Sequence, residues 1–90
     1  RPAEPADLVL DEAAAPLFEA LRALRGELAR ADQVPAYVVF PDRTLAEMAV
    51  RRPRSLHGLG DIRGVGPAKL EKYGERFLAV IRNASDIEAA

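Results

Sequence analysis

Two stretches of this sequence repeat apolar residues every three or four positions, the spacing that places side chains on one face of an α-helix. The apolar positions are Leu17, Leu21, Leu24 and Leu28 in the first stretch and Leu70, Tyr73, Phe77 and Ile81 in the second. Each apolar face needs a partner that covers it, and a chain of 90 residues can build only one sizeable core. The pattern therefore predicts two amphipathic helices, one over residues 14–31 and one from Pro67 onward, that share a core.

One run, Tyr37 to Phe40, has the β-branched and aromatic composition of a strand, and Pro35 and Pro41 bracket it. No second run of this kind is present to pair with it, and a lone strand is not stable. We therefore expect residues 32–42 to form an extended or 3₁₀ connector pressed into the core. The predicted fold class is all-α, a compact bundle of four to five helices.

Local signals place the shorter helices. Asp42 or Thr44 is expected to cap a helix that ends near Arg52, because Thr44 to Glu47 has the form of a capping box and Pro53 follows. Ser55 is expected to cap a short helix that ends around Gly60. Gly74 lies inside the last apolar repeat and is expected to break or kink that helix.

Charge divides the chain into a basic body and acidic ends. Residues 1–14 hold one arginine against four carboxylates, net −3, and residues 85–90 hold two carboxylates, net −2. Residues 15–84 hold twelve Arg or Lys against eight Asp or Glu, net +4. We predict an acidic Pro/Ala-rich linker or tail over residues 1–13, one domain over residues 14–84 and a C-terminal tail over residues 85–90. The run Leu8-Val9-Leu10 could instead dock on the body, and the start at Arg1 rather than Met favours a piece of a longer protein.

The sequence offers no candidate for catalysis or metal binding. His57 is its only histidine, cysteine is absent, and the carboxylates are scattered or spaced as helix-surface partners of basic residues. We expect no active site, no metal and no cofactor. The absence of cysteine fits a reducing cytoplasm, and no apolar run has the length of a membrane span.

The stretch Ile62 to Gly74, "IRGVGPAKLEKYG", places Gly64 and Gly66 around a valine between two helices. This pattern resembles the helix-hairpin-helix element of DNA-binding proteins, in which backbone N–H groups at a helix start receive a phosphate. A tight turn between helices would use the same glycines, so both interpretations stay open. We expect Gly66 to need its unhindered backbone, and Lys69 to be a surface cation whose loss leaves stability unchanged.

Basic and aromatic side chains near the hairpin complete a candidate nucleic-acid surface. Tyr37 could present its ring for base stacking from a rigid connector, or it could be a core tyrosine with its hydroxyl at the surface. The basic pairs could be ordinary solvated helix faces. The candidate residues are Arg22, Arg25, Tyr37, Arg63, Gly64, Gly66, Lys69 and Lys72.

Four stretches, in order, resemble the HRDC domain, the helicase and RNase D C-terminal module. They are the helix from Leu17 onward with its L-x-x-L-R pattern at Leu21 to Arg25, the "VPAYVVF" connector, the "DRTLAEMA" helix and the "GVGPAKLEKYG" hairpin, and together with their spacing they cover residues 17–81. The sequence of these stretches is most similar to that of the HRDC domains of bacterial RecQ DNA helicases. The resemblance implies a five-helix bundle without catalytic activity, attached to an ATP-dependent DNA helicase. It also implies that Tyr37 and the basic residues above face single-stranded or structured DNA.

Two function classes remain open. The first is an accessory nucleic-acid-binding module, weak in its binding, monomeric, and cytoplasmic near the bacterial nucleoid, with an RNA-handling RNase D-type parent as a variant. The second is a regulatory module that contacts the helicase core of its own chain or a protein partner. A continuous positive strip through Arg25, Tyr37 and Lys69 would favour the first, and interrupting carboxylates would favour the second.

Overall fold

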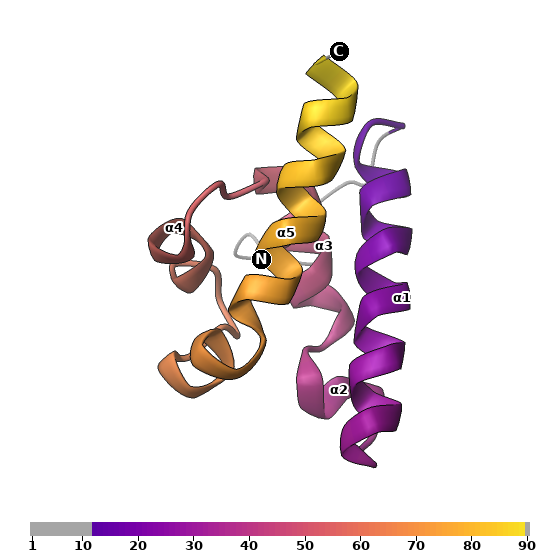
Figure 1. Cartoon of the computed structure of the whole chain (residues 1–90), viewed down its shortest axis with the longest axis vertical. Coiled ribbons are helices and arrows are strands. Elements are labelled where there is room, and N and C mark those ends of the chain that lie inside the picture. The colour runs from indigo at the N-terminus through magenta and orange to yellow at the C-terminus, as the bar shows by residue number, and fades with distance from the viewer. Residues whose placement is uncertain (1–11, 90) are drawn as a thin grey trace, which may run out of the picture.

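The computed structural model describes residues 12–89 and shows five helices with no strand in that range. They are α1 (Ala14–Asp32), α2 (Ala36–Val39), α3 (Asp42–Arg51), α4 (Leu56–Gly60) and α5 (Pro67–Ala89), shown in Figure 1. The predicted all-α five-helix bundle is confirmed. None of these helices is both long enough and apolar enough to cross a membrane.

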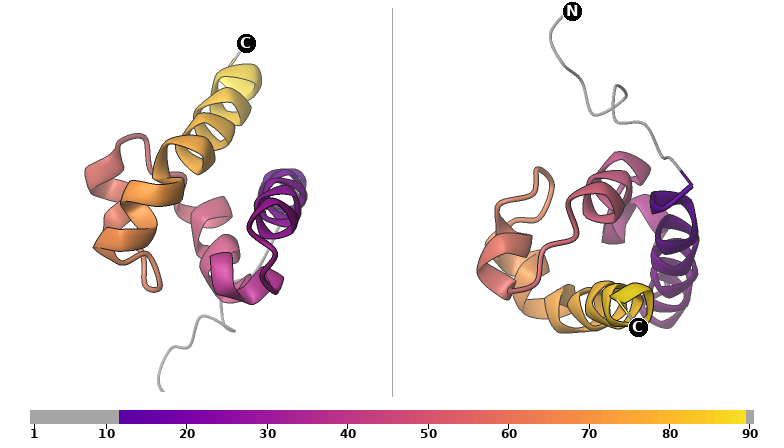
Figure 2. Two further views of the ribbon diagram at one scale, coloured as in Figure 1. Left: turned by 60° about the horizontal axis from the view of Figure 1, so that its bottom comes forward. Right: turned by 90° about the horizontal axis from the view of Figure 1, so that it is seen from above.

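The two long helices, α1 and α5, contact each other, and α1 also packs against α2 and α3. The short helix α4 packs against α5, on the side away from α1 (Figure 2). Six of the eight apolar residues that the helical spacing singled out are buried, among them Leu17, Leu21, Phe77 and Ile81, and the other two, Leu28 and Leu70, are partly buried against the core. The hydrophobic effect on these faces is what holds the bundle together.

Three aromatic rings tie the connector to α5. The ring of Phe40, which is fully buried, lies 5.0 Å from Phe77 and 6.1 Å from Tyr73 between ring centroids, both in edge-to-face arrangements. Rings packed in this way stabilise the fold beyond the area they bury. The connector is therefore anchored to the last helix by its final aromatic residue.

The connector contains a single helical turn, α2, where the sequence predicted an extended or 3₁₀ segment. Val38 N–H donates to Pro35 O at 3.0 Å and Phe40 N–H to Ala36 O at 3.4 Å. Pro35 and Phe40, on either side of the turn, have extended backbone angles. The bracketing prolines thus limit the helix to one turn, because proline carries no N–H that could continue it.

The prediction of a side-chain cap for α3 is wrong. Pro41 is the N-cap and makes no side-chain hydrogen bond, while Asp42 and Thr44 lie inside the first turn. The Thr44 hydroxyl instead donates to Arg63 O of the hairpin at 3.1 Å. The predicted Ser55 cap is confirmed, since its Oγ accepts from Gly58 N–H at 3.0 Å.

Gly74 does not break α5, which is continuous from Pro67 to Ala89, although its axis changes direction in the orange first part of its length (Figure 2). Gly74 is buried, and a Cβ atom on it would lie 3.0 Å from Leu70 Cδ1 and 3.1 Å from Leu56 Cδ2. The absence of a side chain lets α4 approach α5 closely. The apolar repeat continues past the glycine and outweighs its low helix propensity.

Residues 85–89, which the sequence assigned to a tail, continue α5. The predicted domain end at residue 84 and the linker over residues 1–13 stay predictions, because residues 1–11, including Leu8-Val9-Leu10, lie outside the described part of the chain.

Candidate nucleic-acid interface

The turn α2 presents Tyr37 to solvent and Phe40 to the core. The Tyr37 side chain is 70% exposed, and Val38 beside it is also exposed, while Val39 and Phe40 are fully buried. Within one turn, two apolar residues anchor the connector and two face outward. The alternative in which Tyr37 is a core tyrosine is therefore wrong.

Lys69, on the first turn of α5, is bonded to the connector. Its Nζ donates to Val38 O at 2.6 Å and lies 3.4 Å from Val39 O, and the same ammonium lies 6.0 Å from the centroid of the Phe40 ring. The side chain is half-buried. Lys69 therefore supports the connector, which differs from the surface cation that the sequence predicted.

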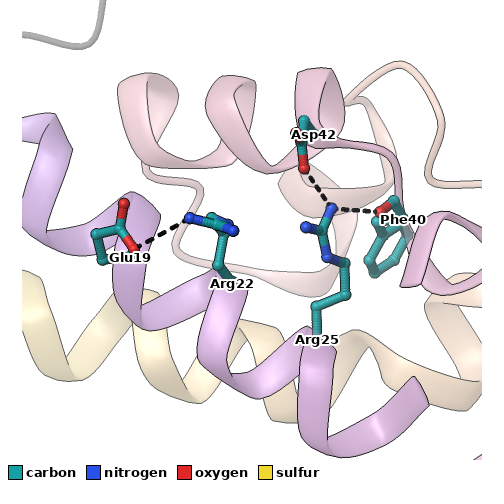
Figure 3. Close-up of polar contacts among 5 residues, drawn as sticks. All are labelled: Glu19, Arg22, Arg25, Phe40 and Asp42. Atoms are coloured by element: carbon teal, nitrogen blue, oxygen red, sulfur yellow. Dashed lines mark hydrogen bonds and ion pairs between the residues drawn. The ribbon is translucent and has the colours of Figure 1, made fainter. Parts of the chain in front are cut away.

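Arg25, on α1, also reaches the connector and is 8% exposed. Its Nη1 donates to Phe40 O at 2.9 Å and pairs with Asp42 Oδ1 at 2.7 Å, as Figure 3 shows. Its Nε is buried without a hydrogen-bond partner in the described residues. A guanidinium held in this way is not presented to a ligand at the surface.

Arg22 lies one turn before Arg25 on α1 and is exposed, with its Nη1 3.4 Å from Glu19 Oε1 (Figure 3). It lines a shallow groove whose other walls include Gly26 of α1 and Ala36 of α2. The groove reaches α2 at Ala36, the residue before Tyr37. An exposed ion pair at 3.4 Å is weak, so Arg22 can exchange Glu19 for another anion.

The hairpin between α4 and α5 is closed by Val65 N–H, which donates to Ile62 O at 3.0 Å. Gly64 has a φ of 97°, and a Cβ on it would lie 2.3 Å from Thr44 Oγ1. Gly66 has no atom within 4 Å of its would-be Cβ. The expectation that Gly66 needs an unhindered backbone is therefore wrong: the turn needs Gly64, and Gly66, which directly precedes α5, has open space around its Cβ position.

Lys72 and Tyr73 meet the last residue of α1. Asp32 Oδ2 accepts from the Tyr73 hydroxyl at 2.6 Å and from Lys72 Nζ at 3.1 Å, and the Lys72 ammonium lies 5.4 Å from the Tyr73 ring centroid. The Tyr73 hydrogen bond, followed by that of Lys72, lowers the pKa of Asp32. The bond to Asp32, followed by burial, raises the pKa of Tyr73, and the bond to Asp32 likewise raises the pKa of Lys72.

These pKa shifts predict that the folded protein loses stability at acid pH. Because the folded-state pKa of Asp32 lies below its ordinary value of 3.8, its contribution is present above that value and is lost as the pH falls through the lowered pKa. Thermal melts should show that Asp32→Asn lowers the melting temperature at pH 7 and that the gap from wild type narrows below pH about 4. Tyr73→Phe removes the main cause of the shift, so its melting temperature should also approach that of wild type below pH about 4. A difference in melting temperature that does not change with pH would contradict the assignment.

The structure brings some of the predicted site residues together and separates the roles of others. Three features meet at α2: Tyr37, Lys69 and the groove beside Arg22. The hairpin holds Arg63, Gly64 and Gly66. Lys72, on α5, lies beside the last residue of α1. Three of the five basic candidates, Arg22, Arg25 and Lys72, each pair with a carboxylate. Carboxylates thus lie beside three of the five basic side chains, and the continuity of the positive strip stays a prediction.

Sequence reasoning missed three residues that shape this region: Asp32, Asp42 and Thr44. Each pairs with a side chain or carbonyl that is distant in sequence, so no local spacing marks it. Within residues 12–87, no three His, Asp or Glu side chains gather as a metal site would require.

Comparison with known proteins identifies the fold. The family model of the HRDC domain matches residues 14–81. The chain belongs to the HRDC domain family. A solved structure titled "D. radiodurans RecQ HRDC domain 3" superposes with a TM-score of 0.78 at 44% identity, covering 81% of this chain and 96% of that one.

Two curated relatives place this HRDC domain in a wider protein context. The ATP-dependent DNA helicase RecQ of Haemophilus influenzae is 44% identical over 73 residues, and that of Bacillus subtilis is 47% identical over 66 residues. These matches cover 81% and 73% of the chain but only 12% and 11% of the two helicases. The chain therefore corresponds to a small part of such a protein, and the resemblance to RecQ HRDC domains is confirmed.

Proposed function

We propose that this HRDC domain is a non-catalytic accessory module of a RecQ-type, ATP-dependent DNA helicase in the bacterial cytoplasm. In this role it makes a small, weak contact with single-stranded DNA. The observation that carries the proposal is the exposed ring of Tyr37, held out of the core on a connector whose next residues are buried. An aromatic face in solvent can stack on any base, since every base has a π-face.

In this proposal three cations contact the phosphates on either side of the stacked base. Arg22 lies along the groove that leads to α2, Arg63 is exposed in the hairpin, and Lys72 is exposed at the end of α1. The open space at Gly66 allows a phosphate to approach the start of α5, where backbone N–H groups and the helix dipole favour an anion. Arg25 and Lys69 are left out of these contacts because both are committed to backbone carbonyls.

A second function is favoured by the paired cations. With Glu19, Asp42 and Asp32 between the basic residues, the surface carries both signs of charge, which suits a polar contact with a protein surface. In this alternative the domain regulates the helicase core of its own chain, and Tyr37 with Val38 forms the apolar centre of that contact.

A titration of the 90-residue chain with fluorescently labelled oligothymidine tests the first function. We expect a dissociation constant on the order of 10⁻⁴ to 10⁻⁶ M at low salt. Three phosphate contacts at about −0.7 each predict a slope near −2 for the logarithm of the association constant against that of salt concentration. No binding at low salt, or binding indifferent to salt, would reject the DNA function and leave the regulatory one.

Arg76→Ala provides the control for this titration. Arg76 is an exposed cation of α5 that belongs to none of the proposed contacts. Its loss should leave the slope unchanged, whereas Arg22→Ala should reduce the slope by about 0.7. Equal effects of the two variants would mean that binding follows net charge rather than the proposed surface.

A further inference from the structure

The turn α2 ends with carbonyl groups that its own helix cannot satisfy. The N–H that would bond Tyr37 O belongs to position 41, which is a proline, and the backbone leaves the helical conformation at Phe40 and Pro41. The carbonyls of Val38, Val39 and Phe40 therefore have no partner within α2. A helix of four residues is unstable alone, so donors from elsewhere must hold it.

Those donors come from two other helices. Lys69 of α5 reaches Val38 O and Val39 O, and Arg25 of α1 reaches Phe40 O. Both donors are cationic, and hydrogen bonds from charged donors are roughly twice as strong as neutral ones. Each donor also makes a second contact with the same segment: the Lys69 ammonium lies over the Phe40 ring, and Arg25 forms an ion pair with Asp42.

We propose that Lys69 and Arg25 are positioning residues that fix the α2 turn, and with it the orientation of the Tyr37 ring, and that neither contacts nucleic acid. The proposal rests on the proposed DNA contact of Tyr37, which it deepens. A ring that is already oriented loses less conformational freedom when a base stacks on it. The rival explanation is that the buried side chains of Val39 and Phe40 suffice to hold the turn.

Hydrogen exchange without DNA separates these explanations. In Lys69→Met the hydrocarbon stem is kept and the ammonium is lost. We expect the Val38 and Phe40 amides to exchange on the order of tenfold faster, as the loss of one charge-assisted hydrogen bond predicts. Lys72→Met is the matched control, a lysine of the same helix that bonds Asp32 instead of α2, and should leave those amides unchanged. Unchanged exchange in Lys69→Met would overturn the proposal.

Binding measurements then distinguish a positioning residue from a phosphate contact. Lys69→Met should weaken binding of oligothymidine about three- to tenfold without changing the salt slope, and should have no further effect once Tyr37 is alanine. A slope reduced by about 0.7, together with an equal loss in the Tyr37→Ala background, would show a phosphate contact and overturn the proposal. If the wild-type chain does not bind DNA, the proposed function fails, while the exchange result still decides whether Lys69 holds the turn.

Arg25 is tested with a variant that preserves its charge. Arg25→Lys keeps the charge, but its side chain is one bond shorter than the path to Nη1, the single nitrogen that contacts both Phe40 O and Asp42 Oδ1, so it should also speed exchange of the Phe40 amide. Arg22→Lys, one turn away and exposed, should not. Equal exchange in the two variants would remove Arg25 from the proposal.

Discussion

Replacing Gly64 with alanine should lower the free energy of unfolding by about 2–4 kcal/mol, and the same change at Gly66 should lower it by less than about 0.5 kcal/mol. Two costs combine at Gly64. Its φ of 97° is a conformation that L-residues avoid, and the new Cβ would lie 2.3 Å from Thr44 Oγ1, which must then move. Thr44 is 1% exposed and bonded to Arg63 O, so it has little room to give way.

Urea or thermal unfolding measures the difference between the two glycines. For a domain of this size, 1 kcal/mol corresponds to about 4–8 °C, so Gly64→Ala should melt roughly 8–32 °C below wild type. In the Thr44→Ala background the steric part of the cost should disappear and the conformational part should remain. If Gly66→Ala were the more damaging variant, the described hairpin geometry would be wrong.

The elements that sequence patterns predicted well are those whose stability comes from burial. The repeats of α1 and α5 required a common core whatever the loops did, because an exposed apolar face of that length is unfavourable. The same reasoning explains why α5 continues through Gly74. The local cost of a glycine, about 1 kcal/mol, is small against the burial of Tyr73 and Phe77 on either side of it.

The failures share a cause, which is that polar side chains choose partners by tertiary position. Thr44 has the sequence signature of a cap, but its hydroxyl lies beside the hairpin and bonds Arg63 O. Arg25 and Lys69 have the spacing of surface cations, and nothing in that spacing indicates that the connector folds over them. The sequence contains a hint only in the connector itself, since the two prolines leave carbonyls that need donors.

The hairpin shows the same division at a finer scale. The motif predicted a tight turn with glycines at positions 64 and 66, and the turn is present. Which of the two glycines is obligatory depends on the bond from Val65 N–H to Ile62 O and on where Thr44 lies. Neither is visible along the chain, so the sequence alone does not show that Gly64 is the obligatory glycine.

The second large effect concerns two aromatic residues of the connector with opposite roles. Phe40→Ala should lower the free energy of unfolding by about 3–5 kcal/mol, because it empties a fully buried site between Tyr73 and Phe77. A small domain has only about 5–15 kcal/mol in total, so this variant should be partly unfolded at 37 °C. Phe40→Leu keeps most of the volume and should remain folded, with a smaller loss.

Tyr37→Ala should do the reverse. Its ring is exposed, so the free energy of unfolding should change by less than about 0.5 kcal/mol. Loss of one base stack, worth about 1–3 kcal/mol, should weaken DNA binding roughly 5- to 150-fold. Thermal melts and oligothymidine titrations of wild type, Tyr37→Ala and Phe40→Leu separate the two roles. Tyr37→Phe serves as the matched control, since it retains the stacking face and should bind DNA nearly as well as wild type. Undiminished binding in a folded Tyr37→Ala variant would leave the exposed ring without a role in DNA binding and would favour its use in a contact with the helicase core.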